Sequence, residues 1–346
     1  MIRVLRTSAL LRYLASFITS ISLFAAVPPA HAAPSLAEVQ ARVRALQEDA
    51  ASAGEAAQQA RVQLDQLKRQ LASVQQAASN QAQNVSAYQK SLGSIAREEY
   101  KSGGLGEGFQ LLFSSDPTLY LSSAGALESI TRKKALALKK YSVARQRLTA
   151  TSLTVNDKLA LVKAAEAKYQ AQATAAQAKL KQAQDLLNTL TAAERARLAA
   201  LVNAQENADQ AASLAEARRA NLGSGRGAIA LRFAIKQIGD RYVFGAAGPI
   251  WWDCSGLTMR AFQAAGVSLP HSAAAQTGYG KRIPFSALRP GDLVFFAHRG
   301  SHYISHVGIY LGGGRMVNAP HPGARVKVES FGSTFGSLIF SGARRI

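Results

Sequence analysis

One residue in the sequence is distinguished by its chemistry, the single cysteine Cys254. Its neighbours predict a helix whose first turn holds the cysteine, behind Asp253 and ahead of Ser255. Because the positive end of a helix stabilises a thiolate, this arrangement indicates a nucleophile. A lone buried cysteine can also be an inert apolar residue, and the thiol taken alone leaves that alternative open.

A thiolate nucleophile needs a base that later protonates the leaving amine, and histidine performs both tasks near neutral pH. Of the six histidines, only His306 opens a predicted strand, and a strand holds a base more rigidly than a loop. Asn318 lies on the next predicted strand, so hairpin pairing across residues 312–314 would bring its amide beside His306. The amide oxygen could then orient the imidazole, as the third member of a triad does.

The elements that position these residues follow one another in a recognisable order. Two helices are expected first, at residues 228–239 and 254–265. Short β-rich runs then alternate with glycine and proline turns, at residues 292–296, 306–310, 315–318 and 325–328. Helices followed by strands predict an α+β domain with an antiparallel sheet over residues 228–346.

The preceding part of the chain has a helical pattern. An unbroken heptad of mainly apolar residues runs from Leu36 to Ile95, and a looser one covers residues 127–220. Glycine and proline interrupt the pattern at residues 102–126. We therefore expect a long antiparallel coiled-coil hairpin over residues 33–220 with its tip at 102–126, followed by a linker at 221–227. Alanines at four successive seam positions would let another helix approach closely: Ala50, Ala53, Ala57 and Ala60.

Residues 1–32 have the composition of a secretory signal peptide. Three arginines precede an apolar run over residues 14–27, and residues 30–32 form a small-x-small cleavage site. A membrane anchor is the less favoured alternative, because the apolar run is shorter than the ~20 residues of a spanning helix. We therefore expect a secreted, extracellular or periplasmic chain associated with the cell wall.

The net charge of +20 is concentrated at the C-terminal end, where residues 224–346 contain 14 basic and 4 acidic residues. Nucleic acid would be the expected partner of such a domain in the cytoplasm. An exported domain instead meets anionic lipids, wall polymers and peptide carboxylates. A basic surface that serves only solubility is the alternative, because charge alone identifies no partner.

Taken together, residues 228–340 resemble the NlpC family of cell-wall cysteine peptidases, which have a papain-like fold. The resemblance rests on segments that occur in the family's order: residues 241–245, 253–257, 269–272 with Gln276, 288–296 and 306–312. It implies hydrolysis of the peptidoglycan stem peptide between γ-D-glutamate and a diamino acid, meso-diaminopimelate or lysine, without metal or cofactor. It also implies Cys254 as nucleophile, His306 as base and Asn318 as the orienting residue.

The resemblance implies secondary roles as well. Tyr242 matches a tyrosine near the oxyanion, whereas Asp253 and Ser255 match residues that contact the amino end of the substrate. The chain departs from the usual family residues at four positions: Arg241, Ala246, His271 and Asn318. Because the nucleophile and base are kept, these departures concern rate and substrate preference.

The N-terminal part is similar to the coiled-coil regions of exported wall hydrolases controlled by the FtsE and FtsX division complex. The similarity covers residues 100–104, 113–116 and 127–130 and implies that the coil tip contacts such a complex. The coil would then control or localise the enzyme, although a plain spacer has the same sequence pattern. Two other functions remain open: an amidase or acyltransferase on the same fold, and a wall-binding scaffold without activity.

Overall fold

The computed structural model describes residues 34–101, 117–301 and 303–346. The predicted signal peptide and residues 102–116 of the predicted tip lie outside the described residues. Two long helices form the N-terminal part, α1 (Leu36–Lys101) and α3 (Pro117–Asn188). Among the described residues, none of the helices combines the length and the apolar character that crossing a membrane requires.

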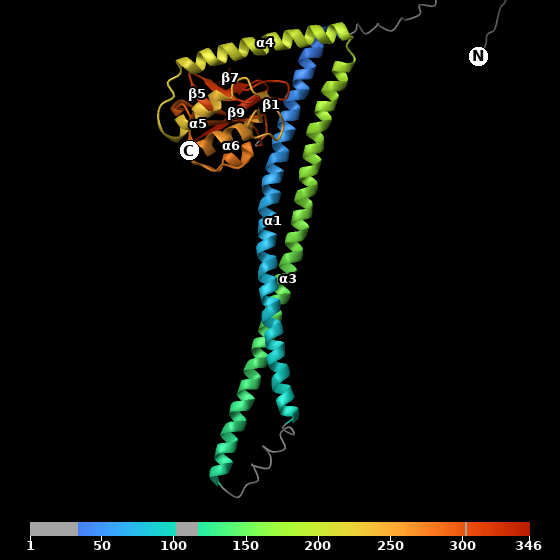
Figure 1. The fold of residues 1–346 in the computed structure, drawn as a ribbon, viewed down its shortest axis with the longest axis vertical. Coiled ribbons are helices and arrows are strands. Elements are labelled where there is room, and N and C mark those ends of the chain that lie inside the picture. The colour runs from blue at the N-terminus through green and yellow to red at the C-terminus, as the bar shows by residue number, and fades with distance from the viewer. Residues whose placement is uncertain (1–33, 102–116, 302) are drawn as a thin grey trace, which may run out of the picture. The chain divides into compact units, whose positions relative to one another are not determined.

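Helices α1 and α3 pack against each other in antiparallel directions (Figure 1). Near the start of α1, Val39 and Val43 pack with Ala183 near the end of α3. Farther along α1, Leu64 packs with Val162 in the middle of α3. The long helical hairpin predicted from the heptads is therefore present.

The second helical stretch was predicted as one element to residue 220, and this prediction is wrong. Helix α3 ends at Asn188, and a separate helix, α4 (Ala192–Arg219), follows. A capping box starts the new helix: Thr191 Oγ1 accepts from the backbone N–H of Glu194, and the Glu194 carboxylate accepts from the N–H of Thr191. These two hydrogen bonds satisfy backbone groups at a helix start, so they favour a break at this point.

The C-terminal domain contains helices on one side and an antiparallel sheet. Its helices are α5 (Gly225–Lys236), α6 (Cys254–Ala264) and α7 (Ala273–Gln276), and a 3-10 turn, η1, covers Phe285–Ala287. The small parallel pair is β1 (Arg241–Tyr242) and β2 (Trp251–Trp252). The larger sheet has the order β3-β9-β4-β5-β6-β7, with β8 on β9. Its strands are β3 (Lys281–Ile283), β4 (Leu293–His298), β5 (Ile304–Gly312), β6 (Arg315–Asn318), β7 (Lys327–Ser330), β8 (Thr334–Phe335) and β9 (Leu338–Arg345).

The predicted α+β class is correct, and β4 to β7 lie close to the predicted strands. Strand β9 was missed because its sequence holds Ser341-Gly342 and ends in two arginines. Pairing with β3 and β4 stabilises it despite this composition. Helix α5 starts at Gly225, inside the predicted linker, so the connection from α4 is shorter than expected.

Helix α4 covers β7, the strand at the end of the larger sheet (Figure 1). The backbone N–H of Val328 donates to Ser213 Oγ at 2.9 Å, and Lys327 Nζ donates to Asp209 Oδ2 at 3.0 Å. Another carboxylate of α4, that of Glu206, accepts a hydrogen bond from the backbone N–H of Arg325. Helix α4 therefore protects an edge strand whose backbone groups would otherwise be unpaired.

Helix α1 contacts the C-terminal domain through a segment of small residues. Ala51 is part of the domain's main apolar core, and Gly54 lies against the ring of Phe244. A side chain at position 54 would overlap that ring. Small residues that lie beside the predicted seam alanines therefore let the C-terminal domain approach α1 closely.

Candidate active site

Cys254 is the first residue of α6, as predicted, and its side chain is buried. Asp253 caps the helix: one carboxylate oxygen accepts from the N–H of Gly256 at 2.6 Å. The other oxygen accepts from the N–H of Gly245 at 2.9 Å. The thiol is thereby fixed between the start of α6 and the turn that follows β1.

His306 and Asn318 lie side by side on the paired strands β5 and β6, with Nε2 of the imidazole 3.0 Å from Oδ1 of the amide. Asn318 Nδ2 donates to Glu329 on β7 at 3.1 Å, which keeps the amide oxygen turned toward the ring. Phe335 stacks on the imidazole with ring centroids 5.2 Å apart. Helix α6, which starts with Cys254, packs on β5, and the backbone of Val307 on that strand acts to lower the pKa of the thiol.

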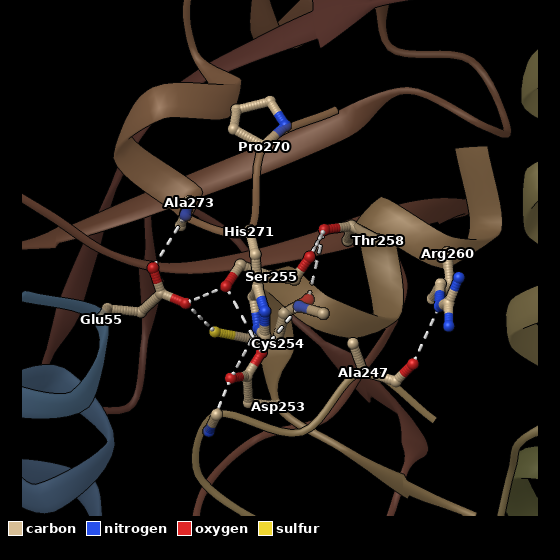
Figure 2. A network of polar contacts seen from close by, with 12 residues as sticks. Glu55, Ala247, Asp253, Cys254, Ser255, Thr258, Arg260, Pro270, His271 and Ala273 are labelled. Carbon is tan, nitrogen blue, oxygen red and sulfur yellow. Dashed lines mark hydrogen bonds and ion pairs between the residues drawn. The ribbon is translucent and has the colours of Figure 1, made fainter. Parts of the chain in front are cut away.

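A fourth side chain, Glu55 of α1, reaches the thiol from outside the domain (Figure 2). Its Oε1 accepts hydrogen bonds from Cys254 Sγ at 3.2 Å and from Ser255 Oγ. Its Oε2 accepts from the backbone N–H of Ala273 at 2.8 Å. Glu55 is 2 % exposed, so its carboxylate fills the space directly over the thiol.

Sequence reasoning missed Glu55. The residue lies between seam positions Ala53 and Ala57, where a coiled coil normally exposes its charges. A signal was nevertheless present, because it is the one acidic side chain in a run of small residues that includes Gly54, at residues 50–57. A glycine inside a helix often marks a close approach by another part of the chain.

The electrostatics around the thiol favour its neutral form. Burial raises the pKa of Cys254 well above its usual range, and the charges of Glu55 and Asp253 raise it further. Burial lowers the pKa of His306 to about 4, against the opposing effect of its hydrogen bond with Asn318. Burial and the charges of Glu55 and Asp253 therefore act against the helix end, which was expected to favour the thiolate.

Glu55 is itself perturbed. Burial raises its pKa to about 7, and the nearby charge of Asp253 acts in the same direction. Three hydrogen bonds to Ser255, Ala273 and Cys254 oppose this shift by stabilising the charged form. A carboxyl group in this position is close to half protonated at neutral pH.

The remaining predicted site residues surround the same thiol. Tyr242 is buried, and burial together with the charge of Cys254 raises its pKa well above the usual range. Ser255 Oγ contacts both Glu55 and Asp253. The described residues bring together no group of three or more His, Cys, Asp or Glu side chains suited to holding a metal ion.

The other described histidines have separate contacts. His271 Nε2 lies 2.8 Å and 2.9 Å from the two carboxylate oxygens of Asp253. His298 contacts Ser52 of α1 at 2.8 Å. His321 Nδ1 lies 2.9 Å from the carbonyl oxygen of Pro322. His306 is thus the histidine that the structure pairs with Asn318.

A buried thiol, an imidazole and an orienting amide can perform nucleophilic acyl transfer. The thiol supplies the nucleophile, the imidazole moves the proton, and the amide fixes the ring tautomer. In the observed arrangement, Glu55 covers the thiol, and burial raises the pKa of Cys254 and lowers that of His306.

Comparisons with known proteins match the C-terminal domain. Residues 239–345 match the NlpC/P60 family. The probable endopeptidase p60 of Listeria monocytogenes is 45% identical over 107 residues, covering 31% of this chain and 21% of the relative. The peptidoglycan endopeptidase RipA of Mycobacterium tuberculosis is 40% identical over 111 residues, covering 28% of this chain and 23% of the relative.

Among solved structures, the NlpC/p60 domain of the peptidoglycan hydrolase SagA is 36% identical. That match covers 35% of this chain and 98% of the SagA domain, with a TM-score of 0.31. The chain spans only about a fifth of the length of the curated relatives that it matches. Through its residues 239–345, the C-terminal domain of this chain belongs to the NlpC/P60 family.

Proposed function

We propose that this protein is a peptidoglycan endopeptidase that hydrolyses the stem-peptide bond between γ-D-glutamate and the diamino acid, meso-diaminopimelate or lysine. The observation that carries the proposal is the pairing of His306 on β5 with Asn318 on β6, together with the packing of α6, which starts with Cys254, against β5. Family membership of the domain and the names of its relatives, endopeptidase p60 and peptidoglycan endopeptidase RipA, support the reaction class.

In the proposed reaction, Cys254 transfers its proton to His306 as Sγ attacks the carbonyl carbon of γ-D-glutamate. The amine of the diamino acid leaves as the C–N bond breaks, taking that proton from the imidazolium. A water molecule then attacks the thioester, with His306 accepting its proton, and the released thiol closes the cycle. Asn318 orients the imidazole throughout, and Tyr242, Asp253 and Ser255 are proposed to contact the substrate around the thiol.

Digestion of purified muropeptides followed by mass spectrometry tests this proposal. An endopeptidase releases fragments that end in γ-D-glutamate, whereas an amidase frees the whole stem and an acyltransferase joins it to an added amine. The Cys254→Ala variant should release none of these fragments. Unchanged muropeptides with the wild-type chain would instead favour a wall-binding scaffold.

We also propose that α1 controls the enzyme by covering its nucleophile. The carboxylate of Glu55 accepts hydrogen bonds from Cys254, Ser255 and Ala273, so a substrate carbonyl has no path to Sγ while α1 is docked. The pKa of Cys254 is raised in part by the charge of Glu55, which opposes thiolate formation as well. An exported wall hydrolase needs such control, because its unrestrained activity would damage the cell's own wall.

Export through residues 1–32 and a partner of the FtsE and FtsX type at the coil tip remain proposals from the sequence. A partner that binds the undocked form of α1 better than the docked form would shift the population toward open, active enzyme. Adding candidate partners to the full chain and following muropeptide release tests this. A partner that binds the tip without raising the rate would leave the coil as a localising device.

A further inference from the structure

His271 is a titratable residue at the site that the proposed catalytic trio does not use. It precedes α7, and its Nε2 lies within 3 Å of both carboxylate oxygens of Asp253 (Figure 2). Its side chain is 18% exposed, and that of Asp253 is 2% exposed. The two side chains therefore form a largely buried pair next to the residue that carries the thiol.

Asp253 has opposing effects on Cys254. Its oxygens accept from the N–H groups of Gly256 and Gly245, so the carboxylate fixes the start of α6 and the turn beside it. Its negative charge lies one residue from the thiol and raises the pKa of Cys254, after the larger effects of burial and of Glu55. The carboxylate that positions the nucleophile therefore also opposes its ionisation unless a positive charge compensates it.

We propose that His271 is a positioning residue for the nucleophile: its imidazolium neutralises Asp253, which can then hold the start of α6 without opposing the Cys254 thiolate. The two short contacts to Asp253 carry this inference, because a histidine bound to both oxygens of a carboxylate gains most from that carboxylate when it is protonated. The importance of this role for catalysis rests on the proposed function, in which Cys254 is the nucleophile.

The charged groups around His271 are consistent with a protonated ring. Burial alone would lower its pKa, but the hydrogen bond and charge of Asp253 outweigh burial and raise it. Glu55 of α1 acts in the same direction, and Arg61 of α1 opposes it. Because Asp253 belongs to the domain itself, its effect on His271 persists when α1 is not docked.

The experiment measures the thiol directly. The full chain carries Glu55→Ala, so that this carboxylate no longer contacts Cys254, and the rate of alkylation by iodoacetamide is followed against pH. The midpoint of that curve reports the apparent pKa of the thiol. His271→Gln keeps a hydrogen-bond donor and removes the charge, whereas His271→Arg keeps a permanent charge.

Relative to the parent chain, which carries Glu55→Ala alone, we expect His271→Gln to raise the midpoint of the alkylation curve by about one pH unit. His271→Arg should leave the midpoint at or below that of the parent. In a chain with Asp253→Asn, which keeps a good helix cap, His271→Gln should cause less than about a third of that shift, because no carboxylate remains to be neutralised. His298→Gln is the matched control, because His298 contacts Ser52 instead of Asp253.

Equal midpoints for the parent and His271→Gln would overturn the inference, as would a full shift that persists with Asp253→Asn. If the glutamine variant does not fold, a higher midpoint in His271→Arg overturns it as well. A chain that shows the shift but leaves muropeptides intact contradicts only the proposed function. A chain that cleaves muropeptides without the shift contradicts only the role of His271.

Discussion

Helices α1 and α4 both pack on the NlpC/P60 domain, but by different chemistry. On the α4 side, Lys327 lies 3.0 Å from Asp209 and 3.6 Å from Glu206, and Ser213 accepts from the backbone of β7. On the α1 side, burial raises the pKa of Glu55, and the nearby charge of a second carboxylate, Asp253, raises it further. The α4 contact thus joins opposite charges, whereas the α1 contact brings like charges together.

This difference in charge predicts which of the two contacts separates more easily. A buried lysine among carboxylates is stabilised as long as its partners remain, so α4 should behave as part of the domain. A carboxylate buried near another carboxylate loses its hydration and meets a like charge, and both effects disfavour its charged form. The α1 contact should therefore be weaker and easier to release. If the hairpin and the domain separate, we expect the joint at residues 189–191, where α3 ends and α4 has yet to begin.

The largest expected effects concern the residues that are proposed to carry out the reaction. Cys254→Ala should abolish muropeptide cleavage, and His306→Ala should slow it by roughly 10²–10⁴-fold, because proton transfer is lost. Asn318→Ala should slow it less, because the amide only orients the ring. Rates from mass spectrometry decide the order; equal losses for Asn318 and His306, or a larger loss for His321→Ala, would show that Asn318 is misassigned.

The α1 contact should respond to pH. Glu55 has a pKa of about 7 when docked and a value near 4.5 when exposed, so docking takes up a proton between these values. Docking is therefore strongest below about pH 4.5 and weakens as the pH rises toward 7. The rate of wild type divided by that of Glu55→Gln should rise roughly tenfold between pH 5 and 8, because glutamine cannot titrate.

Taking this ratio removes the titrations that Cys254, His306 and His271 have in the undocked form, where Glu55 lies away from them and the two chains are alike. A ratio that stays flat, or that falls as the pH rises, would contradict the assignment of Glu55 as the group that couples docking to a proton.

Much of the site was predictable because its signals are local. The start of α6 follows from the residues around Cys254, and the hairpin that joins β5 to β6 places His306 beside Asn318. The break before α4 was also readable, since Thr191 and Glu194 have the spacing of a capping box. The run of small residues around Glu55 signalled a close approach, but its partner Cys254 was not predictable, because that contact spans 199 residues and a heptad only specifies helix–helix contacts.

The α4 contact should affect stability without affecting control. Lys327→Ala leaves Glu206, Asp209 and Glu329 close together without their cation, which should lower the free energy of unfolding by about 2 kcal/mol. Thermal melting measures this loss. At a temperature where Lys327→Ala is folded, its rate of muropeptide cleavage is compared with that of the same chain carrying Gly54→Leu as well. The ratio of these two rates should equal the ratio of wild type to Gly54→Leu. A changed ratio would mean that α4 also restrains the site.

The central claim, that α1 covers the nucleophile, is tested most directly by a substitution that separates the two without touching the site. Gly54→Leu places a side chain where the Phe244 ring lies, whereas Gly93→Leu makes the same change on α1 where nothing lies within 4 Å. Both changes favour the helix equally. With soluble muropeptides as substrate, the full chain with Gly54→Leu should be at least about tenfold faster than wild type, equivalent to ~1.4 kcal/mol, and Gly93→Leu should match wild type. Equal rates for the two leucine variants would contradict the claim and leave the coil as a spacer.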